Sequence, residues 1–189
     1  MKQKQFPMRI FILLVFSVLV GCTSSKDLVV NAEKAKKLEQ YIESNDFQVI
    51  SDWAEPLATN GYNALNIVPR GASASRISIT KADSHFRKKG DSISIHLPYF
   101  GTQQISTSRA FDNTNGGIVF DGIPKDYKKS FNDKKQFYQI EFTFRRGAES
   151  YDVTLKLYKN LKAEIFVDST HRTSILYKGK TEEYSPTKP

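Results

Sequence analysis

The chain has 189 residues, of which 39% are apolar and 25% are charged, a balance that fits one globular domain and excludes disorder throughout. Its single cysteine excludes an intrachain disulfide framework and any site built from several cysteines. Its three histidines leave little for a histidine-based metal centre, and its formal net charge is +8.

The N-terminus has the organisation of a secretory signal peptide. Lys2, Lys4 and Arg9 make a positively charged start, and residues 10–20 form an apolar run that Ser17 alone interrupts. This run has about half of the roughly 20 residues that a helix needs to cross a bilayer. The segment therefore predicts export rather than a stable membrane span.

A glycine and a cysteine end this run, and Gly21-Cys22 resembles the lipobox of bacterial lipoproteins. The resemblance implies cleavage before Cys22, acylation of its thiol and new amino group by chains such as palmitate, and stable anchoring, since each buried methylene contributes about 0.8 kcal/mol. A plain signal peptide with an incidental cysteine is the alternative. Because Thr23 follows instead of aspartate, we expect an outer-membrane lipoprotein of the cell envelope, on either the periplasmic or the surface face.

Removal of residues 1–21 leaves 25 basic and 20 acidic residues, a formal net charge of +5. Such a mild excess does not indicate nucleic-acid binding, and we expect no nucleic-acid partner. The clustered lysines are predicted to lie on solvated faces and loops: Lys34, Lys36, Lys37, Lys128, Lys129, Lys134 and Lys135.

The mature chain is predicted to contain one domain. Residues 22–30 are a predicted tether, residues 31–181 a β-rich domain and residues 182–189 a disordered tail. The domain begins with an amphipathic helix, with Asn31 as N-cap and an end near Ser44. Its apolar side chains recur at three- and four-residue spacing at Ala35, Leu38, Tyr41 and Ile42.

Beyond the helix, apolar residues alternate with polar ones, which is typical of strands with one buried face. The predicted strands are residues 47–53, 62–68, 77–79, 93–97, 138–144, 151–157, 163–167 and 175–178. Their spacing leaves no room for helical crossovers, so we predict a mostly β fold: an antiparallel β-sandwich or flattened barrel of about eight strands with one N-terminal amphipathic helix. Trp53 is predicted on the core face of the first strand, and residues 82–90 and 102–117 are predicted loops.

We find no catalytic constellation. Asp83, Ser84 and His85 place a carboxylate, a hydroxyl and an imidazole in one predicted loop, but a triad depends on placement in space and not on adjacency. His96 falls on the polar face of its strand and is predicted at the surface. The sequence also has no phosphate loop, HExxH or EF-hand pattern. We therefore predict no catalytic residues, no metal ligands and no cofactor.

One block stands out: in Leu97-Pro98-Tyr99-Phe100-Gly101, a proline ends a strand and two aromatic residues follow. With Phe47-Gln48-Val49 and residues 117–121 and 169–179, this block resembles the Bacteroidetes lipoprotein family known as domain of unknown function 4251, over residues 32–180. Family members often carry Arg-Ala after the glycine, where this chain has Thr102-Gln103. The family has no assigned activity, so the resemblance implies compartment and strand order but no chemistry.

Tyr99 and Phe100 are the candidate binding residues, with Arg172 as the polar companion of Tyr99. We expect the two aromatic side chains to splay to opposite sides of the chain. Either both are packing residues, with Gly101 needed for a left-handed turn, or Tyr99 presents its hydroxyl to a ligand or partner.

Together these features favour a lipid-anchored binding or envelope-assembly module without enzymatic activity. Its expected partners are the membrane, through the anchor, and an envelope protein or a small apolar ligand. One alternative is a carrier of an apolar ligand in a cavity between the sheets, and another is a hydrolase with unidentified residues. A cavity lined by Phe and Tyr would favour the carrier, a filled core the binding module, and a perturbed acid or histidine in a cleft the hydrolase.

Overall fold

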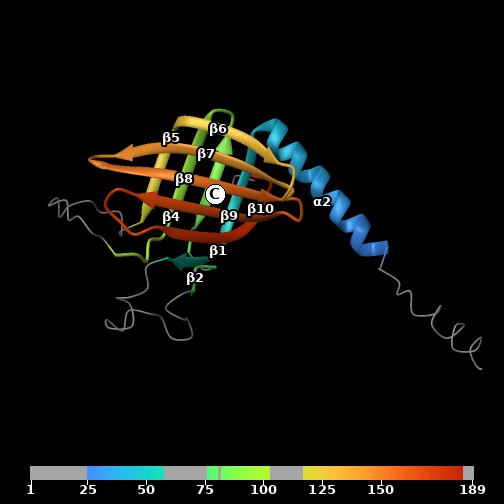
Figure 1. Cartoon of the computed structure of the whole chain (residues 1–189), viewed down its shortest axis with the longest axis horizontal. Coiled ribbons are helices and arrows are strands. Elements are labelled where there is room, and N and C mark those ends of the chain that lie inside the picture. The colour runs from blue at the N-terminus through green and yellow to red at the C-terminus, as the bar shows by residue number, and fades with distance from the viewer. Residues whose placement is uncertain (1–24, 58–75, 81, 103–116, 185–189) are drawn as a thin grey trace, which may run out of the picture.

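The computed structural model describes residues 25–57, 76–80, 82–102 and 117–184 (Figure 1). In this part of the chain one helix, α2 (Ser25–Ser44), precedes ten strands. The strands are β1 (Asp46–Pro56), β2 (Ile77–Ser78), β3 (His85–Lys89), β4 (Ser92–Leu97), β5 (Ile118–Gly122), β6 (Lys125–Asn132), β7 (Phe137–Arg146), β8 (Glu149–Tyr158), β9 (Lys162–Ser169) and β10 (Ile175–Glu182). Within these residues no helix combines the length and apolar character needed to cross a bilayer.

All ten strands belong to one antiparallel sheet in the order β5-β4-β3-β1-β10-β9-β8-β7-β6, with β2 beside β1. The sheet curls so that β3–β5 lie behind β7–β9 and cross them (Figure 1). Aromatic side chains meet across the interior: the ring centroids of Phe86 and Phe142 are 6.0 Å apart, and those of Phe120 and Phe144 are 4.5 Å apart. The predicted antiparallel, mostly β fold is confirmed, as a single sheet curled into a flattened half-barrel.

The interior of the curled sheet is filled by side chains. The alternation predicted for β4, β8 and β9 is confirmed, because their apolar residues are buried at every second position. The largest fully buried side chains belong to one hydrophobic cluster and include Tyr151, Tyr177, Phe47, Phe86 and Phe142.

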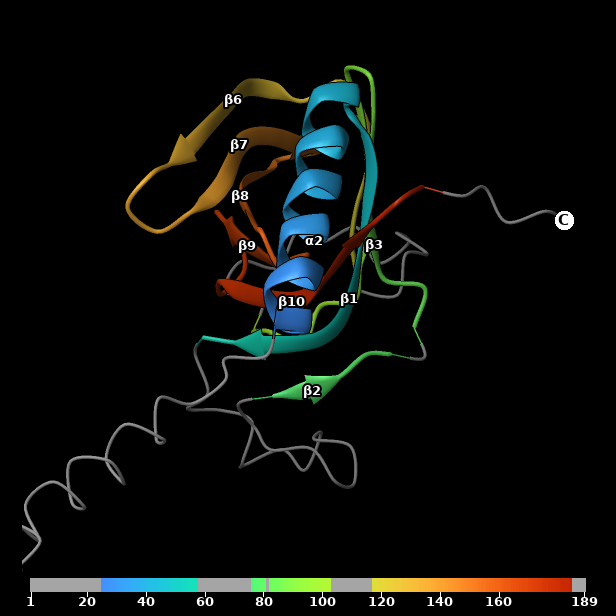
Figure 2. The ribbon, with the colours of Figure 1, turned by 90° about the vertical axis from the view of Figure 1, so that its right-hand side faces the viewer.

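Helix α2 lies between two parts of the curled sheet, one formed by β6–β9 and the other by β1 and β3 (Figure 2). Leu38 and Ile42 are buried in the same core cluster as the strands. The helix ends at Ser44 as predicted, and Asn45 follows with a φ of 51°. Lys129 of β6 donates from Nζ to the backbone oxygen of Ile42 at 3.2 Å and so places a positive charge at the negative end of the helix dipole.

The start of the helix was predicted wrongly. Helix α2 begins at Ser25, so Asn31 lies inside it and much of the predicted tether of residues 22–30 is helical. Ser25 and Asp27 are residue types favoured at the first turn of a helix, which allows the helix to begin there.

Trp53 does not lie on the core face, contrary to the prediction. The pairing of β1 with β10 shifts register between Ser51 and Trp53. This β-bulge inserts one residue, so the alternation changes phase: Ser51 is buried before it, Ala54 is buried after it, and Trp53 is only half-buried.

Strand β3 was predicted as part of a loop because most of its residues are polar or charged. Phe86 is buried, and Lys88 is buried beside it, donating from Nζ to the backbone oxygen of Gly90 at 2.6 Å. The lysine Nζ also lies 4.5 Å from the centroid of the Tyr127 ring, and such a contact stabilises a buried cation. A buried lysine removes the apolar alternation by which a strand is recognised in a sequence.

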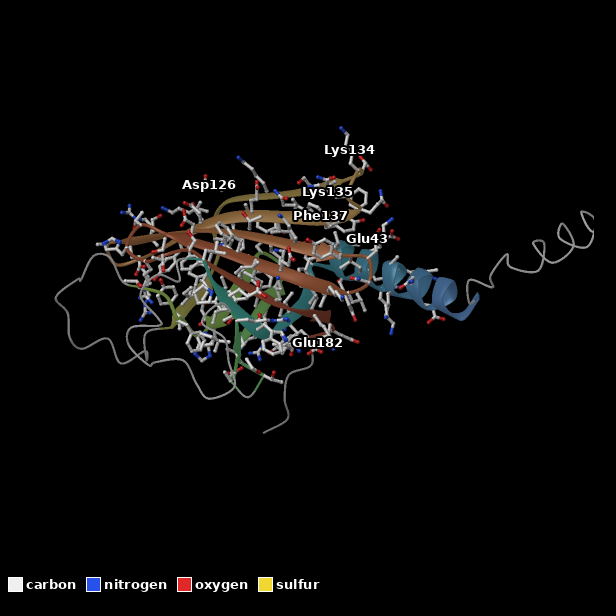
Figure 3. All side chains as sticks on the ribbon, turned by 60° about the horizontal axis from the view of Figure 1, so that its bottom comes forward. Glu43, Asp126, Lys134, Lys135, Phe137 and Glu182 are labelled. Carbon is white, nitrogen blue, oxygen red and sulfur yellow. The ribbon has the colours of Figure 1, made fainter. Side chains whose placement is uncertain are left out.

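Strand β6 was missed for a different reason. It lies at the edge of the sheet and most of its side chains are exposed, including those of Lys128 and Lys129. Lys134 and Lys135 follow in the turn to β7, where Figure 3 shows Lys134 extending away from the sheet. Lysines on an edge strand oppose pairing with the edge of another sheet.

Several predictions fall outside the described residues. They are the signal peptide and Cys22, the strand at residues 62–68 and most of the loop at residues 102–117. Glu182, predicted as the first residue of the tail, belongs to β10 instead, and its Oε1 accepts a hydrogen bond from Gln48 Nε2 at 2.8 Å.

Candidate functional site

The outer face of β3, β4 and β5 carries an open groove with a volume of about 670 Å³. The register of the three strands explains which side chains line it, because directly opposed residues share a face. Strand β3 contributes His85 and Arg87, β4 contributes Ser94 and His96, and β5 contributes Val119 and Asp121.

Two histidines and an aspartate converge at this groove. His85 lies directly opposite His96, with the centroids of the two rings 5.9 Å apart. Asp83 precedes β3 and contacts both rings: its Oδ1 is 2.9 Å from His85 Nδ1, and its Oδ2 is 3.7 Å from His96 Nδ1. We call Asp83, His85 and His96 the DHH cluster.

The surroundings of Asp83 and His85 lower the pKa of both side chains, for different reasons. The hydrogen bond from His85 lowers the pKa of the Asp83 carboxyl, although partial desolvation acts in the opposite direction. Burial lowers the pKa of the His85 imidazole, and this effect outweighs the hydrogen bond to Asp83, which raises it. At neutral pH the pair is therefore an ionised carboxylate beside a neutral imidazole.

The sequence places Asp83 and His85 together in a predicted loop, but it predicts His96 separately, on the polar face of its strand. The signal that could have brought them together is the turn at Gly90-Asp91, which lies equally far from His85 and His96. In a hairpin with this turn, the two histidines must be cross-strand partners. The prediction failed because residues 82–90 were interpreted as a loop, so the first strand of the hairpin was missing.

The predicted binding residue Tyr99 lies in another arrangement, just beyond the end of β4. Its hydroxyl donates to the backbone oxygen of Thr173 at 2.8 Å and lies 3.0 Å from Thr173 Oγ1. Thr102 and Thr173 are also joined by two hydrogen bonds, from Thr173 N to Thr102 O and from Thr102 N to Thr173 Oγ1, both at 3.0 Å. We call Tyr99, Gly101, Thr102 and Thr173 the clasp.

Gly101 is required by close approach and not by a left-handed turn. A Cβ at this position would lie 1.8 Å from the Tyr99 hydroxyl oxygen and 2.7 Å from Thr173 Oγ1. The φ of Gly101 lies outside the left-handed region, which corrects the expectation from the sequence. Tyr99 therefore folds back over the glycine in space that a side chain would fill.

Neither the Tyr99 ring nor the Phe100 ring is fully buried in the core. Both are half-buried and pack against the core cluster. Arg172 does lie next to Tyr99, since its guanidinium carbon is 5.1 Å from the centroid of the tyrosine ring. Arg172 Nε is also 3.0 Å from Glu149 Oε1, and both side chains are largely buried.

The family model of a domain of unknown function, DUF4251, matches residues 30–181. The chain belongs to the DUF4251 family. Among solved structures, it is similar to a DUF4251 family protein from Bacteroides eggerthii DSM 20697, at 12% sequence identity and a TM-score of 0.53. That match covers 80% of this chain and 89% of the other, and it shows a shared fold. A search of the curated proteins found no match.

The family resemblance inferred from the sequence is thus confirmed, and the structure explains two of the segments that carried it. In this DUF4251 chain, residues 97–101 and 169–179 hold one another through the clasp. A further hydrogen bond outside the clasp links the two segments, since Tyr177 donates from its hydroxyl to the backbone oxygen of Pro98 at 2.9 Å. Gly179 permits the close contact of β10 with β1 at the bulge, where a Cβ would lie 1.9 Å from Ile50 O. These residues have packing roles that are independent of any ligand.

Proposed function

We propose that this DUF4251 chain is a lipid-anchored binding module of the cell envelope, which acts without catalysing a reaction and binds its ligand in the groove of β3, β4 and β5. The observation that carries the proposal is the contrast between the two sides of the sheet. The inner side is filled by a continuous hydrophobic core. The outer side has a groove of about 670 Å³, in which imidazole, carboxylate, guanidinium and hydroxyl groups converge among apolar residues such as Pro98 and Val119. Ligand sites combine such concavity with a few convergent polar groups.

The anchor is the part of the proposal that rests on the sequence. Acylation of Cys22 would tie the chain to the outer membrane, and α2 begins only three residues later, at Ser25. Because Leu38 and Ile42 near the other end of α2 are buried in the core, the helix would connect the anchor directly to the domain.

Replacement of the lipidation cysteine tests the anchor. We expect Cys22→Ser to abolish incorporation of labelled palmitate and to leave the chain unprocessed or released from the membrane fraction. If the variant matures and fractionates like the wild type, the anchor is wrong.

Binding in the groove is tested by filling it. We expect Ser94→Tyr to reduce retention of components from a solubilised envelope extract at least tenfold, because the new side chain occupies the floor of the groove. Ser130→Tyr, on the exposed edge strand β6, is the matched control and should retain them as the wild type does. Equal retention by both variants would contradict the groove as the binding surface.

The carrier alternative receives less support from the described residues. It requires an apolar cavity inside the sheet, where Phe47, Phe86, Phe142, Tyr151 and Tyr177 are instead packed together. A second hollow, of about 240 Å³, has charged residues in its wall, namely Lys162, Glu164 and Lys178.

The hydrolase alternative is favoured by one observation, the Asp83–His85 hydrogen bond at the groove, which resembles the orienting pair of a general base. A hydrolase of this kind also needs a nucleophile bonded to the imidazole. In the described ranges no serine or threonine hydroxyl forms a hydrogen bond with His85 or His96. We therefore place catalysis second to binding.

A further inference from the structure

The three side chains of the DHH cluster meet from two neighbouring elements at one point of the groove. The cross-strand pairing of His85 with His96 places their imidazoles side by side, with ring centroids 5.9 Å apart, and Asp83 lies close to both of them. Each of the three residues offers one potential ligand atom, and these atoms lie within 4.8 Å of one another.

These distances are close to those of a metal centre. Nitrogen and carboxylate oxygen ligands lie about 2.0–2.2 Å from zinc, so ligand atoms on one ion are roughly 3–3.5 Å apart. The distance of 2.9 Å between Asp83 Oδ1 and His85 Nδ1 is almost in that range. The other carboxylate oxygen, Asp83 Oδ2, lies 3.7 Å from His96 Nδ1. Because the His96 side chain is 50% exposed, a small rotation can bring its Nδ1 onto the same ion.

We propose that Asp83, His85 and His96 bind a divalent transition-metal ion of the zinc, copper and nickel class through two imidazole nitrogens and the Asp83 carboxylate. The inference rests on the proposed function and deepens it by naming a ligand of the groove. It goes against the expectation from the sequence that the chain has no metal ligands.

The donor set selects this class of ion. Imidazole nitrogens suit zinc, copper and nickel, whereas magnesium and calcium prefer sites made of oxygen ligands. When His85 coordinates through Nδ1, the ion takes the place of the proton in the hydrogen bond between Asp83 and His85. The neutral imidazole then carries its proton on Nε2, so the tautomer changes and no net proton is released. Three protein ligands leave further coordination positions open toward the groove.

The charges around the cluster permit a cation. Asp121 in the groove adds a second carboxylate to that of Asp83. Arg87 opposes binding, but its Nε donates to Gln48 Oε1 at 3.2 Å and its guanidinium carbon lies 5.3 Å from the centroid of the Tyr184 ring. Both contacts hold the guanidinium toward the β1 side of β3.

The test is titration of Zn²⁺ into the full-length chain, purified in detergent without a histidine tag. Every sample carries Cys22→Ser, so that the chain's one thiol cannot bind the ion. We expect one Zn²⁺ per chain, and a rise in the thermal unfolding midpoint that Mg²⁺ at the same concentration does not produce. His96→Gln removes a ligand without disturbing the core and should weaken binding at least about 100-fold, more than the loss of an outer-shell partner does.

His171→Gln is the matched control, because His171 lies between β9 and β10 and its Nδ1 is 2.8 Å from Thr170 Oγ1. It should bind Zn²⁺ as the chain with Cys22→Ser alone does. The proposal is overturned if Zn²⁺ does not bind, if Mg²⁺ stabilises equally, or if His96→Gln binds as tightly as His171→Gln. Retention of envelope components in the presence of EDTA separates the two claims: if it persists while Zn²⁺ fails to bind, the groove remains a binding surface and only the metal site is wrong.

Discussion

Trp53 lies against Arg76 outside the core, with the guanidinium carbon 4.1 Å from the centroid of the indole ring. A cation–π contact at such a site contributes about 0.5–1 kcal/mol. We expect Trp53→Ala to lower the free energy of unfolding by about 1–2 kcal/mol, and Phe47→Ala, which empties a fully buried site on the same strand, by about 3–5 kcal/mol. Urea unfolding of both variants checks this, and equal losses would mean that the bulge does not turn Trp53 away from the core.

The close contact between Gly101 and Tyr99 in the clasp predicts that substitutions at these two positions are energetically coupled. Gly101→Ala should be strongly destabilising on its own, because the added methyl would overlap the Tyr99 ring. When Tyr99→Ala has already removed that ring, the same change should cost much less, so the two effects are not additive. Additive losses in a double-mutant cycle would show that Tyr99 does not occupy the space above Gly101.

Tyr99→Phe distinguishes a structural tyrosine from a binding one. Loss of the hydroxyl leaves the backbone oxygen of Thr173 without this donor, and we expect a cost of about 1–2 kcal/mol with binding to envelope extract unchanged. Unchanged stability with lost binding would instead support the predicted binding role of Tyr99, Phe100 and Arg172.

Buried tyrosines make the fold sensitive to alkaline pH. Burial raises the pKa of Tyr177 and of Tyr151, because the interior excludes the charged phenolate. The folded state thus holds these protons more tightly than the unfolded state, where the pKa is about 10. The stabilisation that these two protonated tyrosines contribute is fully present below about pH 10 and is lost as the pH rises above it.

The urea midpoint should accordingly fall between about pH 9 and pH 11, and Tyr177→Phe should show a weaker fall over the same range. Reversible ionisation of every tyrosine near pH 10, followed by absorbance at 295 nm without unfolding, would contradict the burial of these side chains.

At the scale of elements, α2 is held by a small number of buried side chains. We expect Leu38→Ala to lower the free energy of unfolding by about 2–5 kcal/mol, since Leu38 is fully buried in the core cluster. Gln40→Ala, on an exposed position of the same helix, should change it by less than about 0.5 kcal/mol. Similar small effects of both variants in urea unfolding would indicate that α2 is not docked on the sheet.

A strand could be predicted from the sequence only where its buried side chains are apolar and alternate with polar ones. Strands β4, β8 and β9 bury one apolar face, so simple alternation located them. Strand β3 buries a histidine and a lysine through specific partners, and β6 buries little, so neither has a clear period of two. The missed β3 also concealed the DHH cluster, because the pairing of His85 with His96 exists only within the β3–β4 hairpin.

For the whole molecule, the sequence predicted an antiparallel β fold and the family but could not choose between sandwich and barrel. Closure depends on long-range contacts such as Phe120 with Phe144, which link β5 to β7 across the interior. No local pattern encodes such a contact. The same closure fills the interior and leaves the groove of β3, β4 and β5 on the outside, and this arrangement favours a binding surface over an internal carrier cavity.

Nuclear magnetic resonance of the ¹⁵N-labelled chain in the presence of solubilised envelope extract tests this claim most directly. We expect chemical-shift changes to concentrate at Ser94, His96 and Asp121 on the outer face, with the amides of core residues Phe142 and Leu155 unchanged. Changes confined to the core, with the outer face unaffected, would show that the ligand enters the interior and would contradict the proposed function.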